Sequence, residues 1–255
     1  MPSAVTFDLT GETALVTGAT SGFGERFAEV LSAAGARVIV TGRRVERLER
    51  LRARLEADGR AARAVPLDVT DVASIRRCVA AAESWAGPIT ILVNNAGISI
   101  QSSAAKLTEA DYDAIMATNV KGAFFMAQLV GARMVERAIH GRIVNVASIG
   151  AFKALPGLVA YSMSKAALAM MTKGLAREWA RHHVAVNALC PGYVRTELNS
   201  DWFDSAGGQK QVAGFPRRRL GSAEDLDATL LLLCSRHARF VTGSLFTVDD
   251  GQLLA

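Results

Sequence analysis

Short apolar runs alternate with longer amphipathic segments along almost the whole of this chain. The runs are rich in Val, Ile and Leu, which is typical of strands buried on both faces of a sheet. The segments between them place apolar residues three or four positions apart, as Leu48, Leu51 and Leu55 are in an arginine-rich stretch. The runs predicted to be strands are 14–18, 38–42, 64–69, 89–97, 142–148, 184–192 and 245–251.

This alternation predicts a doubly wound α/β fold, in which helices cover both faces of a parallel sheet. No linker, repeat or low-complexity tract divides the chain, so we expect one domain over residues 1–255. The longest stretch without a regular pattern runs from about residue 193 to residue 221, and its length makes it a candidate substrate lid. After it, Ser222 and Asp225 form a capping box that predicts the start of the next helix.

The composition excludes several classes of protein. Half of the residues are apolar, and the net charge of +5 is spread along the chain without a dense basic run, which argues against a nucleic-acid partner. No apolar run is long enough to span a bilayer and no leader pattern is present, so we expect a soluble, cytoplasmic protein with no membrane partner. Cys78, Cys190 and Cys234 lie far apart, which favours buried thiols, with no disulfide and no metal site.

The first predicted strand ends in TGATSGFG, a glycine-rich turn. Gly18 permits a tight turn, Gly22 lets the backbone approach a ligand, and Gly24 allows the following helix to pack close to the strand. The amides at the start of that helix can then face a pyrophosphate, helped by the helix dipole. The spacing differs from G-x-G-x-x-G, so this loop alone is a weak signal.

A second pattern joins a tyrosine, a lysine and a serine. Tyr161 and Lys165 are four positions apart on a predicted helix and therefore share a face, and Ser148 closes the fifth predicted strand. A phenol titrates near 10, too high for ready proton exchange at neutral pH. A unit charge about 4 Å away contributes roughly 4 kcal/mol at an effective dielectric constant near 20. Lys165 is therefore expected to lower the pKa of Tyr161 and make it a usable acid.

Together these motifs resemble those of the short-chain dehydrogenase/reductase family. The residues that match in order and spacing are TGATSGFG, Asp68-Val69, NNAG (94–97), Asn119, Ser148, YSMSK (161–165) and CPG (190–192). The resemblance implies a Rossmann-type sheet of seven strands in the order 3-2-1-4-5-6-7 and an oxidoreductase, closest in general pattern to 3-oxoacyl-[acyl-carrier-protein] reductases and broad carbonyl reductases. It also implies a homo-oligomer, a tetramer or dimer, formed through helices near 110–138 and 160–182 and the C-terminal segment. Asp250 departs from the pattern, because relatives commonly carry a glycine there.

The resemblance assigns a role to each matching residue. Tyr161 is expected to donate a proton to the substrate carbonyl oxygen, Ser148 to hydrogen-bond that oxygen, and Lys165 to bind the nicotinamide ribose. Asn119 is expected to order a water for the proton relay, which is compatible with a purely structural role in kinking a helix. The residues implied to bind the cofactor are Gly18, Ser21, Gly22, Phe23 and Gly24 at the pyrophosphate, Asp68 and Val69 at the adenine, Asn94, Ala96 and Gly97 at the ribose, and Pro191, Gly192, Val194 and Thr196 at the nicotinamide.

The end of the second predicted strand bears on the choice between NADP and NAD. Relatives that use NAD commonly carry an acid where this chain has Gly42, and a glycine leaves room for a 2′-phosphate. Arg43, assisted by Arg44, can bind that phosphate in a bidentate charged pair. The same arginines could instead begin a cationic surface helix. We therefore expect NADP(H), with NAD(H) as the alternative.

These features predict an enzyme, an NADPH-dependent ketone or 3-oxoacyl-thioester reductase acting on a small-molecule carbonyl. The alternative is an NAD-dependent dehydrogenase of a sugar, polyol or other secondary alcohol; a non-catalytic NADP(H) sensor lies outside this class. The substrate stays open, because Trp202, Phe203 and Phe215 could line a pocket or pack within the lid. The basic run 215–220 could attract a phosphopantetheine carrier or coenzyme A, or be a solvated turn.

Overall fold

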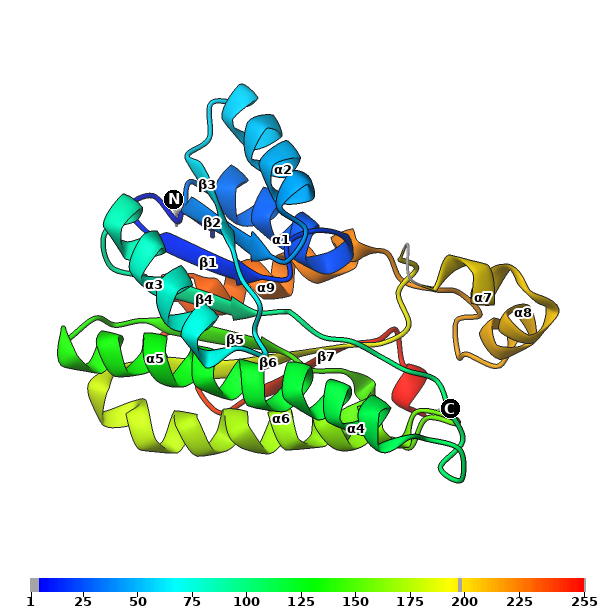
Figure 1. Ribbon diagram of the computed structural model, residues 1–255. Helices are drawn as coiled ribbons and strands as arrows, with labels where there is room; N and C mark the ends of the chain where they lie inside the picture. The colour runs from blue at the N-terminus through cyan, green and yellow to red at the C-terminus, as the bar shows by residue number, and fades with distance from the viewer. Residues whose placement is uncertain (1–4, 197–198, 255) are drawn as a thin grey trace.

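The computed structural model describes residues 5–196 and 199–254. Its seven-stranded parallel sheet has the order β3-β2-β1-β4-β5-β6-β7, which confirms the predicted Rossmann-type fold (Figure 1). The strand order reverses between β1 and β4, and sheets of this kind bind ligands outside the carboxyl ends of the strands at that point. The strands are β1 (Thr13–Thr17), β2 (Arg37–Gly42), β3 (Ala62–Pro66), β4 (Ile91–Asn94), β5 (Arg142–Val146), β6 (Ala185–Pro191) and β7 (Leu245–Val248).

Helices cover both faces of the sheet because successive strand residues point to opposite sides. Val38 and Val40 of β2 join a core formed with α1, α2 and α9, whereas Ile39 between them joins a core formed with α3, α5 and α6. Leu48, Leu51 and Leu55, which α2 buries, supply the apolar face predicted for it. The helices are α1 (Gly22–Ala33), α2 (Val45–Ala57), α3 (Val72–Ala86), α4 (Glu109–Met116), α5 (Ala123–Glu136), α6 (Val159–Trp179), α7 (Ser200–Asp204), α8 (Ala206–Ala213) and α9 (Asp227–Cys234).

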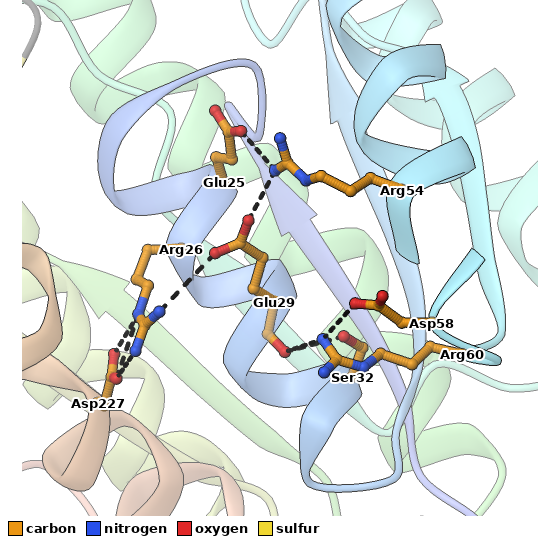
Figure 2. Close-up of polar contacts among 8 residues, drawn as sticks. All are labelled: Glu25, Arg26, Glu29, Ser32, Arg54, Asp58, Arg60 and Asp227. Atoms are coloured by element: carbon orange, nitrogen blue, oxygen red, sulfur yellow. Dashed lines mark hydrogen bonds and ion pairs between the residues drawn. The ribbon is translucent and has the colours of Figure 1, made fainter. Parts of the chain in front are cut away.

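A charged network holds α1 between its two neighbouring helices (Figure 2). Arg54 of α2 lies 2.6 Å from a carboxylate oxygen of both Glu25 and Glu29 on α1. From the other side, Arg26 of α1 forms a salt bridge with Asp227 of α9. Exposed pairs of this kind contribute only about 0.2–1 kcal/mol each, so the network mainly sets where α1 lies. That placement matters because the glycine-rich turn leads directly into α1.

The stretch from 193 to 221 is less irregular than the sequence pattern predicts. It contains α7 and α8, which project from the sheet (Figure 1). The turn between them is stabilised by Ser205, whose hydroxyl accepts a hydrogen bond from the amide of Gly208 at 3.1 Å. A side chain at Gly208 would overlap the backbone of Trp202, so glycine permits the two helices to meet. The role of this stretch as a substrate lid stays a prediction.

The start of the last helix and the three thiols follow the sequence pattern. The predicted capping box is present: the Asp225 carboxylate accepts a hydrogen bond from the Ser222 amide at 2.8 Å, and a short 3-10 turn then leads into α9. Cys78, Cys190 and Cys234 are all buried, and burial raises their thiol pKa values to about 12, 11 and 12. In the described part of the chain, no helix has both the length and the apolarity required to cross a membrane.

Candidate active site

The glycine-rich turn between β1 and α1 is shaped for close contact with a ligand. Gly18 and Gly22 have φ values of +68° and +56°, which favour glycine. A Cβ atom at Gly18 would lie 2.9 Å from the Cα of Ala96, so this turn packs directly on the end of β4. Ser21 caps α1 without a side-chain hydrogen bond to the first helical amides. These amides therefore suit an anionic group such as a pyrophosphate.

Asn95 fixes the position of this turn, a role that the sequence analysis did not identify. Its side-chain amide donates to the carbonyl oxygens of Thr17 and Gly18, at 3.0 and 3.3 Å. The Thr17 hydroxyl in turn accepts from the backbone amides of Asn95 and Ala96, each at 3.0 Å. The chain turns after Asn94 to make these contacts, which explains why β4 ends earlier than predicted. The second asparagine of the NNAG motif was the available signal.

The neighbouring Asn94 points into the protein. Its side-chain amide donates to the carbonyl oxygen of Ala123 at 3.1 Å and to the side-chain oxygen of Asn145 at 3.0 Å. Asn145 donates onward to the Thr172 hydroxyl at 2.9 Å. This buried chain of hydrogen bonds joins β4, β5, α5 and α6. The Asn94 side chain thus serves the packing of the sheet, and its expected place at the cofactor ribose stays a prediction.

The predicted adenine-side residues lie at the end of β3. Asp68 accepts hydrogen bonds from the amide and hydroxyl of Thr70, at 2.9 and 2.7 Å. These bonds, and then the positive charge of Arg43, hold the pKa of the Asp68 carboxyl below its ordinary value. The next residue, Val69, packs closely on Gly122, where a Cβ atom would lie only 2.7 Å from the Val69 carbonyl oxygen. A carboxylate and a cation therefore border this side of the site.

The two arginines after β2 occupy different positions. Arg44 donates to the Thr20 hydroxyl at 2.6 Å and to the Ser21 hydroxyl at 2.8 Å, so its guanidinium lies against the glycine-rich turn. Arg43 is exposed and acts electrostatically on Asp68. Gly42 is buried, and a Cβ atom there would lie 2.8 Å from the methyl carbon of Thr20. Glycine thus keeps the end of β2 close to the turn that the Arg44 guanidinium also contacts.

The structure brings the predicted catalytic residues together at the carboxyl end of β5 and the start of α6. Lys165 is buried, donates to the carbonyl oxygen of Val146 at 2.8 Å, and lies 5.6 Å from the centre of the Tyr161 ring. The Ser148 hydroxyl accepts from the amide of Gly150 at 3.0 Å, which holds the serine beside the tyrosine. Gly97 borders the same space, because a Cβ atom there would lie 3.4 Å from the Lys165 nitrogen.

Burial is the largest influence on the pKa values of Tyr161 and Lys165. It raises the pKa of the Tyr161 phenol, an effect that the nearby Ser148 hydroxyl partly offsets. The expected lowering of this pKa by Lys165 is therefore not found in the free protein. Burial also lowers the pKa of Lys165 from 10.5 to about 8, so most of its molecules stay charged at neutral pH. Desolvation outweighs attraction here because both groups are removed from water.

Asn119 lies on a π-helical turn, Ala117–Gly122, between α4 and α5. Its side-chain amide donates to the carbonyl oxygen of Ile98 at 2.9 Å and to the Ser164 hydroxyl at 3.0 Å. Its side-chain oxygen accepts from the Ile98 amide at 2.8 Å. Ser164, which the sequence analysis did not single out, donates to the Tyr161 carbonyl oxygen at 2.6 Å. Asn119 thus joins the segment after β4 to α6, and its part in ordering a water stays a prediction.

The residues expected at the nicotinamide follow β6. The amide of Gly192 donates to the Val248 carbonyl oxygen at 3.0 Å, and a Cβ atom there would lie 2.6 Å from the side-chain oxygen of Gln252. The side chain of Asn199 accepts from the Thr196 amide at 2.8 Å and donates to the Val194 carbonyl oxygen at 2.9 Å. Hydrogen bonds therefore brace the segment that holds Pro191, Gly192, Val194 and Thr196. Their contacts with a cofactor stay predictions.

A parallel sheet whose strand order reverses between β1 and β4, a glycine-rich turn at that point and a Ser-Tyr-Lys group define a dinucleotide-dependent oxidoreductase. The family model of the short chain dehydrogenases matches residues 12–207. The chain belongs to this family and acts as an oxidoreductase on CH–OH and C=O groups.

Several relatives match nearly the whole chain. A gluconate 5-dehydrogenase of Gluconobacter oxydans is 37% identical, with 96% of each chain covered. A D-threitol dehydrogenase of Mycolicibacterium smegmatis is 38% identical, with 97% of this chain and 95% of the relative covered. An NAD-dependent glycerol dehydrogenase of Listeria innocua is 36% identical, with 97% and 96% covered.

Solved structures show the same likeness. The gluconate 5-dehydrogenase of Burkholderia cenocepacia in complex with NADP and tartrate superposes with a TM-score of 0.93, at 35% identity and 98% coverage of both chains. A 3-oxoacyl (acyl-carrier-protein) reductase of Agrobacterium tumefaciens with NADP bound has a TM-score of 0.90, at 32% identity, with 96% of this chain and 95% of that chain covered.

Proposed function

We propose that this protein is an NADP(H)-dependent dehydrogenase that interconverts a secondary alcohol and a ketone on a small polyhydroxylated substrate. The observation that carries the proposal is the placement of Ser148, Tyr161 and Lys165 at the carboxyl end of β5 and the start of α6, with Lys165 close to Gly97 after β4. A protein that only sensed NADP(H) would have no need of this group.

The residues of the site divide the chemistry among them. NADP(H), when bound, supplies or takes up the hydride. Burial keeps Tyr161 protonated at neutral pH, so it can donate a proton to the carbonyl oxygen; in the reverse direction its phenolate form accepts the proton of the alcohol. Lys165, a buried cation beside the ring, stabilises the phenolate that remains, and Ser148 hydrogen-bonds the oxygen on which negative charge develops.

The preference for NADP(H) rests on the end of β2. Gly42 carries no acid that would repel a 2′-phosphate, Arg44 lies against the glycine-rich turn, and the exposed Arg43 next to it in the chain acts electrostatically on Asp68. A charged hydrogen bond to each would favour the phosphorylated cofactor. NADP in the B. cenocepacia relative supports this choice, whereas the NAD-dependent glycerol dehydrogenase shows that similar chains use the other cofactor.

Two findings favour a hydroxylated substrate over a 3-oxoacyl thioester. Relatives named for gluconate, threitol and glycerol match this chain along its full length. In addition, Arg217 and Arg219, which could have attracted a phosphopantetheine carrier, both bind Asp250, at 2.8 and 2.7 Å. The likeness to a 3-oxoacyl reductase keeps that activity as the second candidate.

The expected homo-oligomer is part of the same proposal. A hollow of about 500 Å³ on α4, α5, α6 and the π-helical turn is lined mainly by apolar side chains, with Phe124 of α5 and Met171 of α6 among them. Phe124 and Met170 keep 37% and 66% of their surfaces exposed. We propose that a second copy of the chain covers this face, and light scattering should then give a multiple of the 27.0 kDa chain mass.

The test of the proposed function is carbonyl-dependent consumption of NADPH. The purified protein is assayed with gluconate-type keto acids, ketoses, simple ketones and a 3-oxoacyl thioester, each with NADPH and with NADH. We expect turnover only when a carbonyl is present, highest with NADPH and a hydroxylated ketone. Turnover confined to thioesters would favour the second candidate, and cofactor binding without any turnover would overturn the enzymatic assignment.

A further inference from the structure

Asp250, in the turn after β7, has a backbone conformation that favours glycine. Its φ value is +53°, in the left-handed region that a residue with a Cβ atom adopts less readily. The turn would therefore form more easily with glycine at this position. What the aspartate adds is a carboxylate, on a side chain that is only 20% exposed. A role for this residue must lie in the contacts of that carboxylate.

The Asp250 carboxylate binds two arginines from the end of the 193–221 stretch. One oxygen accepts a hydrogen bond from Arg217 at 2.8 Å, and the other accepts one from Arg219 at 2.7 Å. These bonds, that from Arg219 first, hold the pKa of the carboxyl below its ordinary value, so the group is charged at neutral pH. The two ion pairs therefore hold residues 217–219 against the turn after β7.

The segment that carries these arginines leads directly to the residues expected at the nicotinamide. Gly221 follows Arg219 by two positions. Its amide donates to the Tyr193 carbonyl oxygen at 3.0 Å, and its carbonyl oxygen accepts from the Arg195 amide at 3.1 Å. Val194, between these two, forms a parallel β-bridge with Gly221. The position of residues 193–195 thus depends on where Gly221 lies.

The turn after β7 also contacts the segment after β6 directly. Gln252 is buried, and its side-chain oxygen accepts from the Tyr193 amide at 2.6 Å. Asp249 stiffens the turn, because its carboxylate accepts from two backbone amides within it, at 3.1 and 2.8 Å. The turn therefore holds both sides of the β-bridge, one through Gln252 and the other through the arginines that Asp250 binds.

We propose that Asp250 is a positioning residue of the active site. Its two ion pairs hold Gly221 against residues 193–195, and they thereby keep the segment after β6 where the nicotinamide half of the cofactor requires it. This role rests on the proposed function and on the expected place of Val194 beside the nicotinamide. The adenosine half is expected at the ends of β2 and β3, so Asp250 should have no effect on its binding.

Two ligands separate the halves of the cofactor: NADPH, and adenosine 2′,5′-bisphosphate, which has no nicotinamide. Their Kd values are measured by calorimetry for the wild type and for Asp250→Asn, which keeps the side-chain shape and removes the charge. We expect Kd for NADPH to rise roughly 2- to 30-fold, the range of two exposed ion pairs, and Kd for the bisphosphate to stay unchanged. At about 1 M salt, which screens exposed charges, the difference in NADPH affinity should shrink.

Three further variants complete the test. Arg218→Ala is the matched control, because Arg218 is exposed and lies between the two paired arginines, and it should leave both Kd values as in the wild type. Arg219→Ala should reproduce part of the loss and add little to Asp250→Asn, since both residues act through one contact. Asp250→Gly suits the backbone conformation, so it should weaken NADPH binding without lowering the melting temperature.

An equal loss for both ligands would assign Asp250 a general structural role and overturn the inference. So would an NADPH affinity that Asp250→Asn and Asp250→Gly leave unchanged, or a loss in Arg218→Ala as large as in Asp250→Asn. If the affinities change as expected but the wild type reduces no carbonyl compound, the proposed function would be overturned and the positioning of the nicotinamide half would stand.

Discussion

The two arginines after β2 allow a quantitative test of cofactor choice. If Arg43 and Arg44 each donate a charged hydrogen bond to the 2′-phosphate, each contributes about 1.5–3 kcal/mol, or roughly 10- to 150-fold in affinity. Arg43→Ala should therefore raise KM for NADPH by a factor in this range and leave KM for NADH nearly unchanged. Arg44→Ala should do the same and also weaken NADH modestly, because it removes the hydrogen bonds to Thr20 and Ser21.

These single substitutions test cofactor choice more specifically than an acid at residue 42 would. A Cβ atom at Gly42 would lie 2.8 Å from the Thr20 methyl carbon, so Gly42→Asp would also disturb the glycine-rich turn. Arg50→Ala is the matched control, because Arg50 is an exposed arginine of α2 and its removal changes the net charge equally. The assay is steady-state kinetics with both cofactors at constant ionic strength. Equal losses for NADPH and NADH, or the same loss in Arg50→Ala, would refute the assignment.

Three further results are expected. Turnover in the reductive direction should fall as the pH rises through about 8, because Lys165 then loses the charge that stabilises the Tyr161 phenolate; a profile that stays flat across pH 8 would contradict this role. The folded state holds the Lys165 proton less tightly than the unfolded state, so the free energy of unfolding should increase between about pH 8 and 10.5. In urea titrations, Lys165→Met should flatten that increase. Gly24→Ala should lower stability by about 1–3 kcal/mol and weaken NADPH binding, because its methyl group would overlap the Gly18 carbonyl oxygen; an unchanged melting temperature would show that the turn can yield.

The sequence predicts the sheet well because burial on both faces leaves a signal in every strand. Ile39 and Val40 of β2 point to opposite cores, and both must be apolar. The end of β4 was predicted too late because the small residues Ala96 and Gly97 extend the run, although the chain turns at Asn95, which holds the loop after β1. That turn depends on a partner 78 positions away in the chain, which local periodicity does not report.

The grouping of the proposed catalytic residues could be predicted because their spacing reflects the fold directly. Tyr161 and Lys165 share a helical face, and Ser148 ends a strand. The hydrogen bonds that support them could not be predicted, since the π-helical turn that carries Asn119 and its bond to Ser164 has no simple pattern in sequence. The sign of the pKa change at the tyrosine also escaped prediction. It depends on how completely the folded chain removes the phenol from water.

The central claim, that Tyr161 is the proton donor of an NADP(H)-dependent oxidoreductase, is tested most directly by Tyr161→Phe. The measurement pairs kcat for ketone reduction with the Kd of NADPH, determined from cofactor fluorescence. We predict that kcat falls by roughly 10²- to 10⁴-fold, the contribution typical of a positioned general acid, while Kd stays close to the wild-type value. A variant that keeps most of its kcat would contradict the account.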